Sequence, residues 1–501
     1  MKPTIYLGFD FGATSGRAVI GRLAGRRLSL KEIHRFPNAP IKGDGALRWD
    51  FPGLWRQVLE TLRICGARGY TPLSGIGIDT WGADFGLLDN NGELIANPRC
   101  YRDRITAGAV AIITKAVSAA RVYKLTGLAP GRVSTLAQLV GLRHSHAKAD
   151  LKHAATLLMM PDLFRFRLCG HKGVDSTNAG ASTLLNLRTG RWSDMLFRQL
   201  KLPRGIMPEL TPPATVVGHL HGALAATAGI NRSPVVAVCG HDTLSAAAAA
   251  PYVDAETAFI SSGTWSVVGV IRKKPITTLQ AMRLGYVNET GLDSILFAKN
   301  MVGLYLLENL RRRLERESKP LSNAALVQAA GKAKPFAGYL DVNAPEFFLC
   351  NDPAATIARF LRRTGQKPVR GWPATARLII EGMAWSFKQA MEELAALTGM
   401  KFKRICLVGG GSRNRLLCQM TADATGLEVR AGPAEATVAG NLAVQALATG
   451  RLKGPESIRE LVRNSFEPET FMPRNMAMWD KAEARRQTTD ARHRTTEDGE
   501  E

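Results

Sequence analysis

Two aspartates, each placed directly after an apolar run, are the residues of this chain best suited to chemistry. Asp10 follows the run Thr4–Phe9 and precedes the turn Phe11-Gly-Ala-Thr-Ser-Gly16, and Asp242 follows the run Val235–Gly240. Open α/β sheets bind ligands at the carboxyl ends of their strands. A metal-holding acid beside a phosphate-binding turn, with a second acid free to accept a proton, is typical of phosphoryl transfer.

The turn after Asp10 is rich in groups that bind anions. Its backbone N–H groups and the hydroxyls of Thr14 and Ser15 can converge on phosphate, although the same sequence also suits a plain hairpin turn. Asp10 would hold Mg²⁺ against nucleotide phosphates; the alternative is a turn aspartate that bonds its own backbone. Taken alone, the turn leaves both interpretations open.

Two further segments have polar residues at strand ends. Asp242 could accept the proton of a substrate hydroxyl, with His241 and Thr243 as hydrogen-bond partners, or it could cap the helix expected near Ala246–Ala250. The loop Asp79-Thr-Trp-Gly-Ala-Asp84 combines an aromatic ring, a glycine and two acids, which suits a sugar but also a structural turn with a packed Trp.

Two common nucleotide-binding classes are disfavoured. The chain contains no G-x-x-x-x-G-K-[ST] segment, which argues against a P-loop enzyme. The segment Gly409-Gly-Gly-Ser-Arg-Asn414 does not fit G-x-G-x-x-G, which argues against a dinucleotide-binding dehydrogenase. Bare glycine backbone at this strand–helix junction would instead let a flat nucleoside lie close to the chain.

Composition predicts a cytoplasmic globular protein of two or three domains. The chain has 501 residues, 45% hydrophobic content and seven widely spaced cysteines without a C-x-x-C pair, which indicates reduced thiols. No run approaches the roughly 18–20 apolar residues of a membrane helix. The net charge of +23 could indicate nucleic-acid or membrane-surface binding, but the basic residues are dispersed, so we expect neither partner.

Periodicity predicts the same beginning for both halves of the chain: a strand, a Ser/Thr-Gly turn and an antiparallel return strand. The first half has strands Thr4–Phe9 and Arg17–Arg22, and the second has strands Thr257–Ser261 and Trp265–Ile271. We therefore predict an α/β fold of two duplicated lobes with a ligand cleft between them.

Further elements fill each predicted lobe. The segments expected to be regular are the first-half strand Leu28–Arg35, helix Phe51–Arg68 and strands Ser74–Thr80 and Asp84–Leu88, and the second-half helices Met301–Leu314 and Ala376–Thr398, strand Arg404–Val408 and helices Arg415–Thr425 and Ala434–Thr449. The predicted domains are residues 1–250 and 251–455, followed by a charged tail over residues 475–501 that we expect to be disordered.

Taken in order, these segments resemble the FGGY carbohydrate kinases of the actin-like and ribonuclease H-like phosphotransferase superfamily. The resemblance spans roughly residues 4–450 and is carried by the motifs Asp10–Arg17, Gly77–Phe85, Tyr101–Asp103, Met160–Asp162, Thr177–Ala179, Gly240–Thr243, Ser261–Ser266, Asn288–Gly291, Lys299–Gly303, Gly409–Gly411 and Ala431–Ala436.

The resemblance implies a role for individual residues at matching positions. Asp242 would be the general base, and Asp10 would lie on the metal side. The residues implied in ATP binding are Ala13, Thr14, Ser15, Gly16, Arg17, Thr264, Glu308 and Gly410. The residues implied in sugar binding are Gly82, His241, Asp242, Thr243 and Asn300. Glu308 stands where the family has a glutamine on the nucleotide side.

The motifs are most similar to those of family members that act on L-rhamnulose. The resemblance therefore implies Mg²⁺- and ATP-dependent phosphorylation of the carbon-1 hydroxyl of that sugar, by a monomer or small homo-oligomer. L-Fuculose, L-ribulose or xylulose are alternative substrates within the same class. A non-catalytic regulator that binds sugar or nucleotide, or a nucleic-acid binder, is the alternative from a different class.

Overall fold

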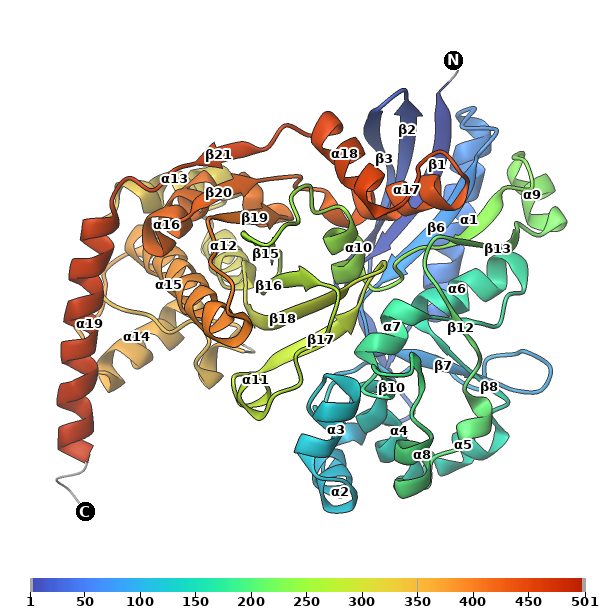
Figure 1. Cartoon of the computed structure of the whole chain (residues 1–501), viewed down its shortest axis with the longest axis horizontal. Helices are drawn as coiled ribbons and strands as arrows, with labels where there is room; N and C mark the ends of the chain where they lie inside the picture. The colour runs from blue at the N-terminus through green and yellow to red at the C-terminus, as the bar shows by residue number, and fades with distance from the viewer. Residues whose placement is uncertain (1–2, 349, 498–501) are drawn as a thin grey trace. The chain divides into compact units, whose positions relative to one another are not determined.

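The computed structural model describes residues 3–348 and 350–497 (Figure 1). The chain divides into two compact units, neither of which is continuous in sequence. Unit 1 comprises Met1–Pro251, Ile271–Ala298 and Ala436–Phe466, and unit 2 comprises Tyr252–Val270, Lys299–Glu435 and Glu467–Glu501. Each unit contains a β-sheet with helices, as the α/β prediction requires.

Unit 1 is built on a mixed sheet in which β1 is central. Its strands, in spatial order, are β13 (Thr215–His219), β14 (Pro234–Ala237), β6 (Gly75–Thr80), β1 (Thr4–Phe11), β2 (Ser15–Ala24) and β3 (Arg27–Pro37). β1 pairs antiparallel with β2 and parallel with β6. The central strands are buried along most of their length, which is the pattern of a sheet covered on both faces.

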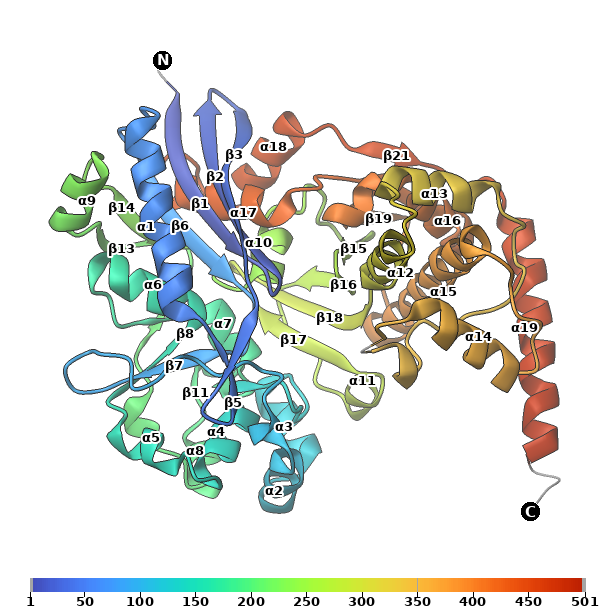
Figure 2. The same cartoon turned by 180° about the vertical axis from the view of Figure 1, so that it is seen from behind.

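Helices α1 (Phe51–Ala67) and α17 (Ala436–Ala448) cover opposite faces of this sheet (Figures 1 and 2). α1 begins where the Asp50 carboxylate accepts a hydrogen bond from the Gly53 N–H at 3.0 Å. α17 is rich in small residues, and a Cβ at Gly440 would lie 1.8 Å from the Ser245 carbonyl oxygen. Glycine therefore allows α17 to pack directly against α10 (Asp242–Ala248).

The remaining elements of unit 1 are short. Its other helices are α2 (Ala109–Ala116), α3 (Ala119–Thr126), α4 (Thr135–Arg143), α5 (Lys148–His153), α6 (Met160–Cys169), α7 (Ser176–Ala181), α8 (Asp194–Gln199), α9 (Gly222–Ala228), α11 (Leu279–Arg283) and α18 (Pro455–Ser465). Its other strands are β4 (Pro40–Gly43), β5 (Ala46–Trp49), β7 (Phe85–Leu88), β8 (Thr156–Met159), β9 (Val174–Asp175), β10 (Leu185–Asn186), β11 (Arg191–Trp192), β12 (Leu210–Thr211) and β17 (Tyr286–Thr290).

Unit 2 repeats the arrangement of an antiparallel hairpin beside a parallel strand. Its strands lie in the order β16 (Trp265–Arg272), β15 (Thr257–Ser262), β19 (Arg404–Val408), β20 (Glu428–Ala431) and β21 (Glu469–Phe471), and β18 (Ile295–Val302) leads into this unit. β15 pairs antiparallel with β16 and parallel with β19. The predicted duplication of the hairpin is confirmed.

The helices of unit 2 differ in length, and α15 is the longest of them. They are α12 (Tyr305–Arg316), α13 (Asn323–Lys332), α14 (Pro353–Arg363), α15 (Trp372–Thr398), α16 (Arg415–Thr425) and α19 (Met476–Glu497). The predicted helix Met301–Leu314 starts too early, because Met301 and Val302 complete β18 and the helix begins at Tyr305. Asn414 caps α16 as expected, with its side-chain oxygen accepting from the Leu417 N–H at 3.0 Å.

The tail differs from the expectation that composition gave, whereas the apolar helices agree with theirs. Residues Met476–Glu497 form α19, whereas the polar composition predicted disorder; residues 498–501 lie outside the described part of the chain. Trp479 is buried against Phe336 and Trp385, with ring centroids 5.0 Å away from each, and this contact anchors the start of the helix. Within the described residues no single helix is long and apolar enough to cross a membrane; only the bent pair Arg104–Ala116 and Ala119–Thr126 passes that test jointly.

Candidate active site

The end of β1 places a carboxylate beside a guanidinium and a second carboxylate. Asp10 lies opposite Arg17 in the β1–β2 pairing and opposite Asp79 in the parallel β1–β6 pairing. The Arg17 Nε and Nη2 atoms donate to the same Asp10 oxygen at 3.0 and 2.8 Å. Arg17 therefore compensates the charge of Asp10, so the two residues predicted for metal and ATP phosphate lie in direct contact.

The turn between β1 and β2 is held from outside by one asparagine. The Gly12 N–H donates to the Ser15 carbonyl at 2.9 Å, which closes the turn. The Asn38 side chain donates to the Gly12 carbonyl at 2.7 Å, and its backbone N–H donates to the Thr14 carbonyl at 3.1 Å. Because these acceptors are engaged, the turn formed by Ala13–Gly16 is suited to offering donors to an anion.

Asp79 is the buried member of the group of carboxylates at these strand ends. One of its oxygens accepts from the Asn441 side-chain amide of α17 at 2.6 Å, and the other is buried without a hydrogen-bond partner in the described part of the chain. Burial raises the pKa of Asp79 well above its usual range, and the negative charges of Asp10 and Asp242 raise it further. The sequence analysis considered this residue only as part of a loop suited to a sugar, although its position at the end of an apolar strand matches that of Asp10.

Asp242 is the first residue of α10 and lies after the strand β14. Its Oδ1 accepts from the Thr243 backbone N–H at 2.6 Å and from the Thr243 hydroxyl at 3.3 Å. The residue preceding the helix is His241, so the alternative of an aspartate N-cap is not what the structure shows. Loss of hydration raises the pKa of Asp242, as does the charge of Asp10, whereas His241 lowers it. The side chain is 33% exposed, so it remains accessible to a substrate.

His241 lies between two carboxylates. Its Nε2 is 3.5 Å from Asp242 Oδ1, and its Nδ1 is 3.6 Å from Glu289 Oε2. A Cβ at Gly82 would lie 3.0 Å from His241 Nε2. The predicted sugar-side residues Gly82, His241, Asp242 and Thr243 are thus brought together at the ends of β6 and β14, and Glu289 is an additional neighbour that sequence reasoning left without a role.

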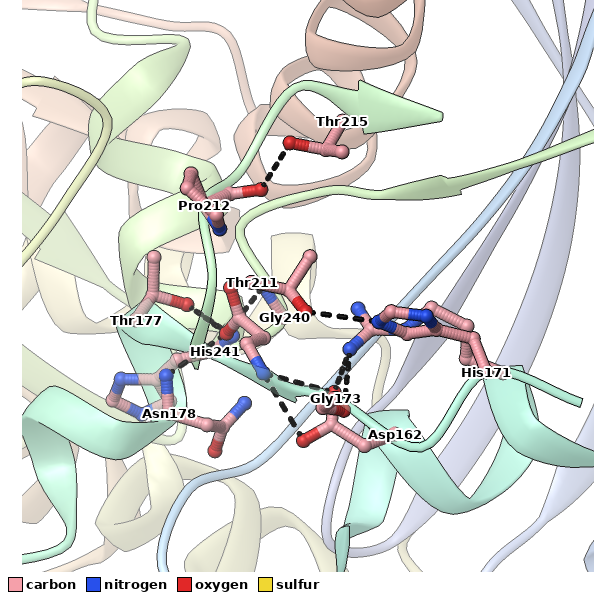
Figure 3. Close-up of polar contacts among 12 residues, drawn as sticks. Asp162, His171, Gly173, Thr177, Asn178, Thr211, Pro212, Thr215, Gly240 and His241 are labelled. Atoms are coloured by element: carbon pink, nitrogen blue, oxygen red, sulfur yellow. Dashed lines mark hydrogen bonds and ion pairs between the residues drawn. The ribbon is translucent and has the colours of Figure 1, made fainter. Parts of the chain in front are cut away.

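A buried polar network supports the turn that carries His241 (Figure 3). One Asp175 oxygen accepts hydrogen bonds from the Thr177 hydroxyl and from the Gly240 N–H, the latter at 3.2 Å. The Thr177 hydroxyl oxygen in turn accepts from the His241 N–H at 3.2 Å. Asp162 accepts from the Asp175 N–H at 3.1 Å. The backbone before Asp242 is therefore held by the side chains of Asp175 and Thr177, at the start of the Thr177-Asn-Ala179 motif.

In unit 2 the turn between β15 and β16 carries Thr264. The Leu304 N–H donates to the Gly263 carbonyl at 2.9 Å, and the Tyr305 N–H approaches the Thr264 carbonyl at 3.3 Å. A Cβ at Gly303 would lie 2.6 Å from both of these carbonyl oxygens. The start of α12 can hold the turn in this way only because residue 303 has no side chain.

The glycine run after β19 exposes bare backbone. Gly409 has φ +82°, and a Cβ at Gly411 would lie 2.3 Å from the Ser262 hydroxyl oxygen. Gly410, by contrast, is exposed, and no described atom would lie within 4 Å of a Cβ there. This arrangement suits the predicted nucleoside contact at Gly410, because a flat ring could approach the backbone without steric hindrance.

The two other predicted residues of unit 2 have different surroundings. Asn300 lies on β18 and is exposed. Glu308 lies in the first turn of α12, where its oxygens accept from Arg311 and Arg312, each donor nitrogen at 2.9 Å. The hydrogen bonds from Arg311 hold the pKa of Glu308 below its usual value. Its carboxylate is therefore engaged by its own helix.

Comparisons with known proteins agree with the motifs. Residues 5–249 match the N-terminal domain of the FGGY family of carbohydrate kinases, and residues 258–449 match its C-terminal domain. The rhamnulokinases of Bacteroides thetaiotaomicron and Bacillus subtilis are 36% and 34% identical to the chain, covering 95% and 94% of it and 97% and 96% of their own lengths.

Solved structures of lower identity share the fold. The ligand-bound xylulose kinase of Lactobacillus acidophilus has a TM-score of 0.79 at 17% identity and covers 96% of each chain. The Plasmodium falciparum glycerol kinase with ADP has a TM-score of 0.77 at 14% identity and covers 99% of this chain and 98% of its own.

Proposed function

Because the chain belongs to the FGGY family of carbohydrate kinases, we propose that it transfers the γ-phosphoryl group of ATP to the carbon-1 hydroxyl of L-rhamnulose. The products are L-rhamnulose 1-phosphate and ADP, and the reaction belongs to rhamnose catabolism in the cytoplasm. The observation that carries the proposal is the similarity to rhamnulokinases over nearly the whole chain. The proposal extends to domain roles: unit 1 binds the sugar and supplies the base, and unit 2 binds the nucleoside.

Asp242 is the proposed general base. Its Oδ1 is held by the Thr243 N–H, and its side chain is partly exposed, so a carboxylate oxygen can reach a substrate hydroxyl. As the carbon-1 oxygen attacks the γ-phosphorus in line, the hydroxyl proton passes to Asp242 and ADP leaves. His241, Thr243 and the glycine backbone at Gly82 orient the sugar, with Asn300 as a further contact.

The phosphate chain is proposed to lie against the Ala13–Gly16 turn, with Arg17 and Thr264 as further contacts. Backbone N–H groups and hydroxyls stabilise charge on the transferring group without needing to reorganise during the reaction. Gly410 provides the surface for the adenine nucleoside. Glu308 is engaged with Arg311 and Arg312 and acts on the nucleotide only indirectly, by shaping the start of α12.

The residues near Asp10 fit a magnesium ion. Mg²⁺ at nucleotide sites takes one or two carboxylates together with phosphates and water. Asp10 and Asp79 offer carboxylate oxygens, and the buried Asp79 oxygen without a partner is a donor of the right chemistry. Within the described residues no group of three or more His, Cys, Asp or Glu side chains is placed so that it could hold a metal ion. When bound, Mg²⁺ neutralises charge on the β- and γ-phosphates.

A panel of ketoses tests the substrate assignment. L-Rhamnulose, L-fuculose, L-ribulose and xylulose are each offered with ATP and Mg²⁺, and ADP release is followed with a coupled assay. We expect kcat/KM for L-rhamnulose to exceed the other values by about tenfold or more, which corresponds to about 1.4 kcal/mol of discrimination. A higher kcat/KM for another ketose would identify that ketose as the substrate. If no ADP were released with any of the four ketoses, the proposal would be overturned.

A further inference from the structure

Glu289 is a buried acid close to the sugar-side residues that the mechanism above leaves without a role. It lies on β17 of unit 1 and is 8% exposed. Its Oε2 is 3.6 Å from Nδ1 of His241, and that Nδ1 is buried without a hydrogen-bond partner in the described part of the chain. Burying an imidazole nitrogen is costly unless it has a partner, and the Glu289 carboxylate, although 3.6 Å away and thus just beyond hydrogen-bond distance, is the charged group that faces Nδ1.

Besides Glu289, one other charged group lies close to the His241 ring, the carboxylate of Asp242. The backbone N–H of His241 is engaged by Thr177, and its Nε2 lies 3.5 Å from Asp242 Oδ1. An ionised carboxylate can only accept hydrogen bonds, so Glu289 requires a proton on Nδ1. The same proton on Nε2 would instead be donated to Asp242, which would weaken that carboxylate as a base.

Gly82 leaves a space beside Nε2. A Cβ at this residue would lie 3.0 Å from Nε2 and 3.2 Å from Cδ2 of the His241 ring. A Cβ there would be tighter than an ordinary van der Waals contact, so any side chain at residue 82 would crowd Nε2. Glycine leaves this edge of the ring open to a substrate hydroxyl, which donates to an imidazole nitrogen from roughly 2.7–3.2 Å.

We propose that Glu289 is a positioning residue that keeps the proton on Nδ1 of His241 and so presents Nε2 as the acceptor for a sugar hydroxyl seated over Gly82. The inference rests on the proposed sugar kinase function and deepens it. Glu289 and Gly82 then act on sugar recognition through a single ring: Glu289 fixes its proton and Gly82 provides the space for the hydroxyl.

Two substitutions at Glu289 test the inference. Glu289→Leu removes the acceptor, whereas Glu289→Gln keeps an oxygen that can accept from Nδ1–H. We expect Glu289→Leu to raise the sugar KM about tenfold, the effect of losing a hydrogen bond to a charged group, with the ATP KM unchanged. Glu289→Gln should restore most of the sugar affinity. Glu60→Gln, at an exposed acid of α1 paired with Arg63, is the matched control and should change neither KM.

A third substitution addresses the space over Gly82. Gly82→Ala places a methyl group 3.0 Å from Nε2 and should also raise the sugar KM by about tenfold or more while leaving the ATP KM unchanged. A Glu289→Leu enzyme with wild-type sugar KM, or one in which both KM values rise equally, would overturn the positioning role. Wild-type sugar KM in Gly82→Ala would overturn the hydroxyl site.

The proton on His241 can be observed without measuring turnover. In protein labelled with ¹⁵N at histidine, the His241 signals are identified by their loss in His241→Asn. We expect Nδ1 to carry the proton in the wild type and in Glu289→Gln, and to lose it in part in Glu289→Leu. A wild-type His241 with its proton on Nε2 alone would overturn the inference. Failure to phosphorylate any ketose would instead overturn the proposed function, and the nitrogen signals would still decide the role of Glu289.

Discussion

The hairpins β1–β2 and β15–β16 have the same construction, but charged side chains lie around the turn of the first, whereas the turn of the second consists of uncharged residues. Each hairpin is antiparallel, and each has a parallel strand beside its first strand, β6 in unit 1 and β19 in unit 2. Beside the first hairpin lie the carboxylates of Asp10, Asp79 and Asp242 and the guanidinium of Arg17. The second turn, Ser262-Gly-Thr264, and the glycine run Gly409–Gly411 are uncharged.

Phosphoryl transfer requires two different functions, and this difference assigns each of them to one unit. Proton transfer and the binding of a cation need ionisable groups whose pKa values respond to their surroundings, and unit 1 supplies them. Recognition of a nucleoside needs close access to backbone, and we propose that unit 2 supplies it at Gly410, which is exposed. Substitution of the proposed base in unit 1 should therefore act on kcat, and substitutions that move the glycine-rich backbone of unit 2 should act on the KM for ATP.

The largest effect is expected for Asp242→Asn. The amide oxygen of Asn can still accept from the Thr243 N–H, so the start of α10 should be preserved, but the side chain can no longer take a proton. We expect kcat to fall by roughly 10²–10⁴-fold with a small change in sugar KM. Steady-state kinetics with the preferred ketose provide the measurement, and Asp194→Asn, at an exposed acid, is the control. Turnover near that of the wild type would remove Asp242 from the mechanism.

The same carboxylate should determine the acidic side of the pH profile. Burial raises the pKa of Asp242, and the charge of Asp10 adds to the rise, although partial exposure limits it. Below the raised pKa the group is protonated and cannot accept a proton. We expect log kcat to fall with a slope of about one per pH unit on that side, with a midpoint above the ordinary aspartate value of about 3.9. The residual activity of Asp242→Asn should lack this acidic limb; if it keeps the limb, another group is responsible.

Sequence patterns were sufficient for the strands β1 and β14 and for the two acids near their carboxyl ends. β1, β14, β15 and β19 are local apolar runs, and the residues that follow them can be identified in the chain itself. Glu289 was not assigned a role and Asp79 was considered only within a sugar-suited loop, because their proximity to His241 and to Asp10 depends on contacts between segments that are distant in sequence. Local sequence does not encode which residue of β6 lies opposite Asp10.

Other differences have the same cause. The polar tail predicted disorder, but Trp479 finds two aromatic partners that are far away in sequence. Glu308 stands where the family has a glutamine, and only the structure shows two guanidinium groups on its carboxylate; its contact with the nucleotide stays a prediction. Composition and alignment describe a residue's type and place, whereas its partners come from tertiary packing.

In unit 2 the expected effect of a backbone change is larger than that of a charge change. Gly303→Ala would place a Cβ 2.6 Å from the carbonyl oxygens of Gly263 and Thr264, and backbone atoms cannot yield as a flexible side chain can. The turn must shift, so we expect the ATP KM to rise by about fivefold to tenfold with the sugar KM unchanged, and stability to fall by about 1–3 kcal/mol.

Kinetics with varied ATP and thermal unfolding measure these two effects. Gly331→Ala in α13 is a matched control, because outside its own helix the nearest atom to its Cβ would be Cδ2 of Leu416 at 3.9 Å, and alanine favours a helix. A Gly303→Ala enzyme with a raised sugar KM and an unchanged ATP KM would contradict the division of work between the two units.

The smallest effect is expected at Glu308, the acid in the first turn of α12. Glu308→Gln removes a negative charge but leaves an oxygen that can accept from Arg311 or Arg312. These pairs are partly exposed, so we expect a loss of stability below about 1 kcal/mol. Because the carboxylate is already engaged within α12, the ATP KM should stay within about fivefold of the wild type, the change that 1 kcal/mol can produce.

The comparison for Glu308→Gln is Glu315→Gln, about two turns further along the same helix. There the acid accepts a hydrogen bond from Arg311 at 3.3 Å. Similar small changes in both variants would mean that Glu308 serves the helix. A change in ATP KM well beyond fivefold at Glu308 alone would mean that a charged group in unit 2 contacts the nucleotide directly. The electrostatic contrast between the two hairpins would then no longer hold, because both units would use ionised side chains on the substrate.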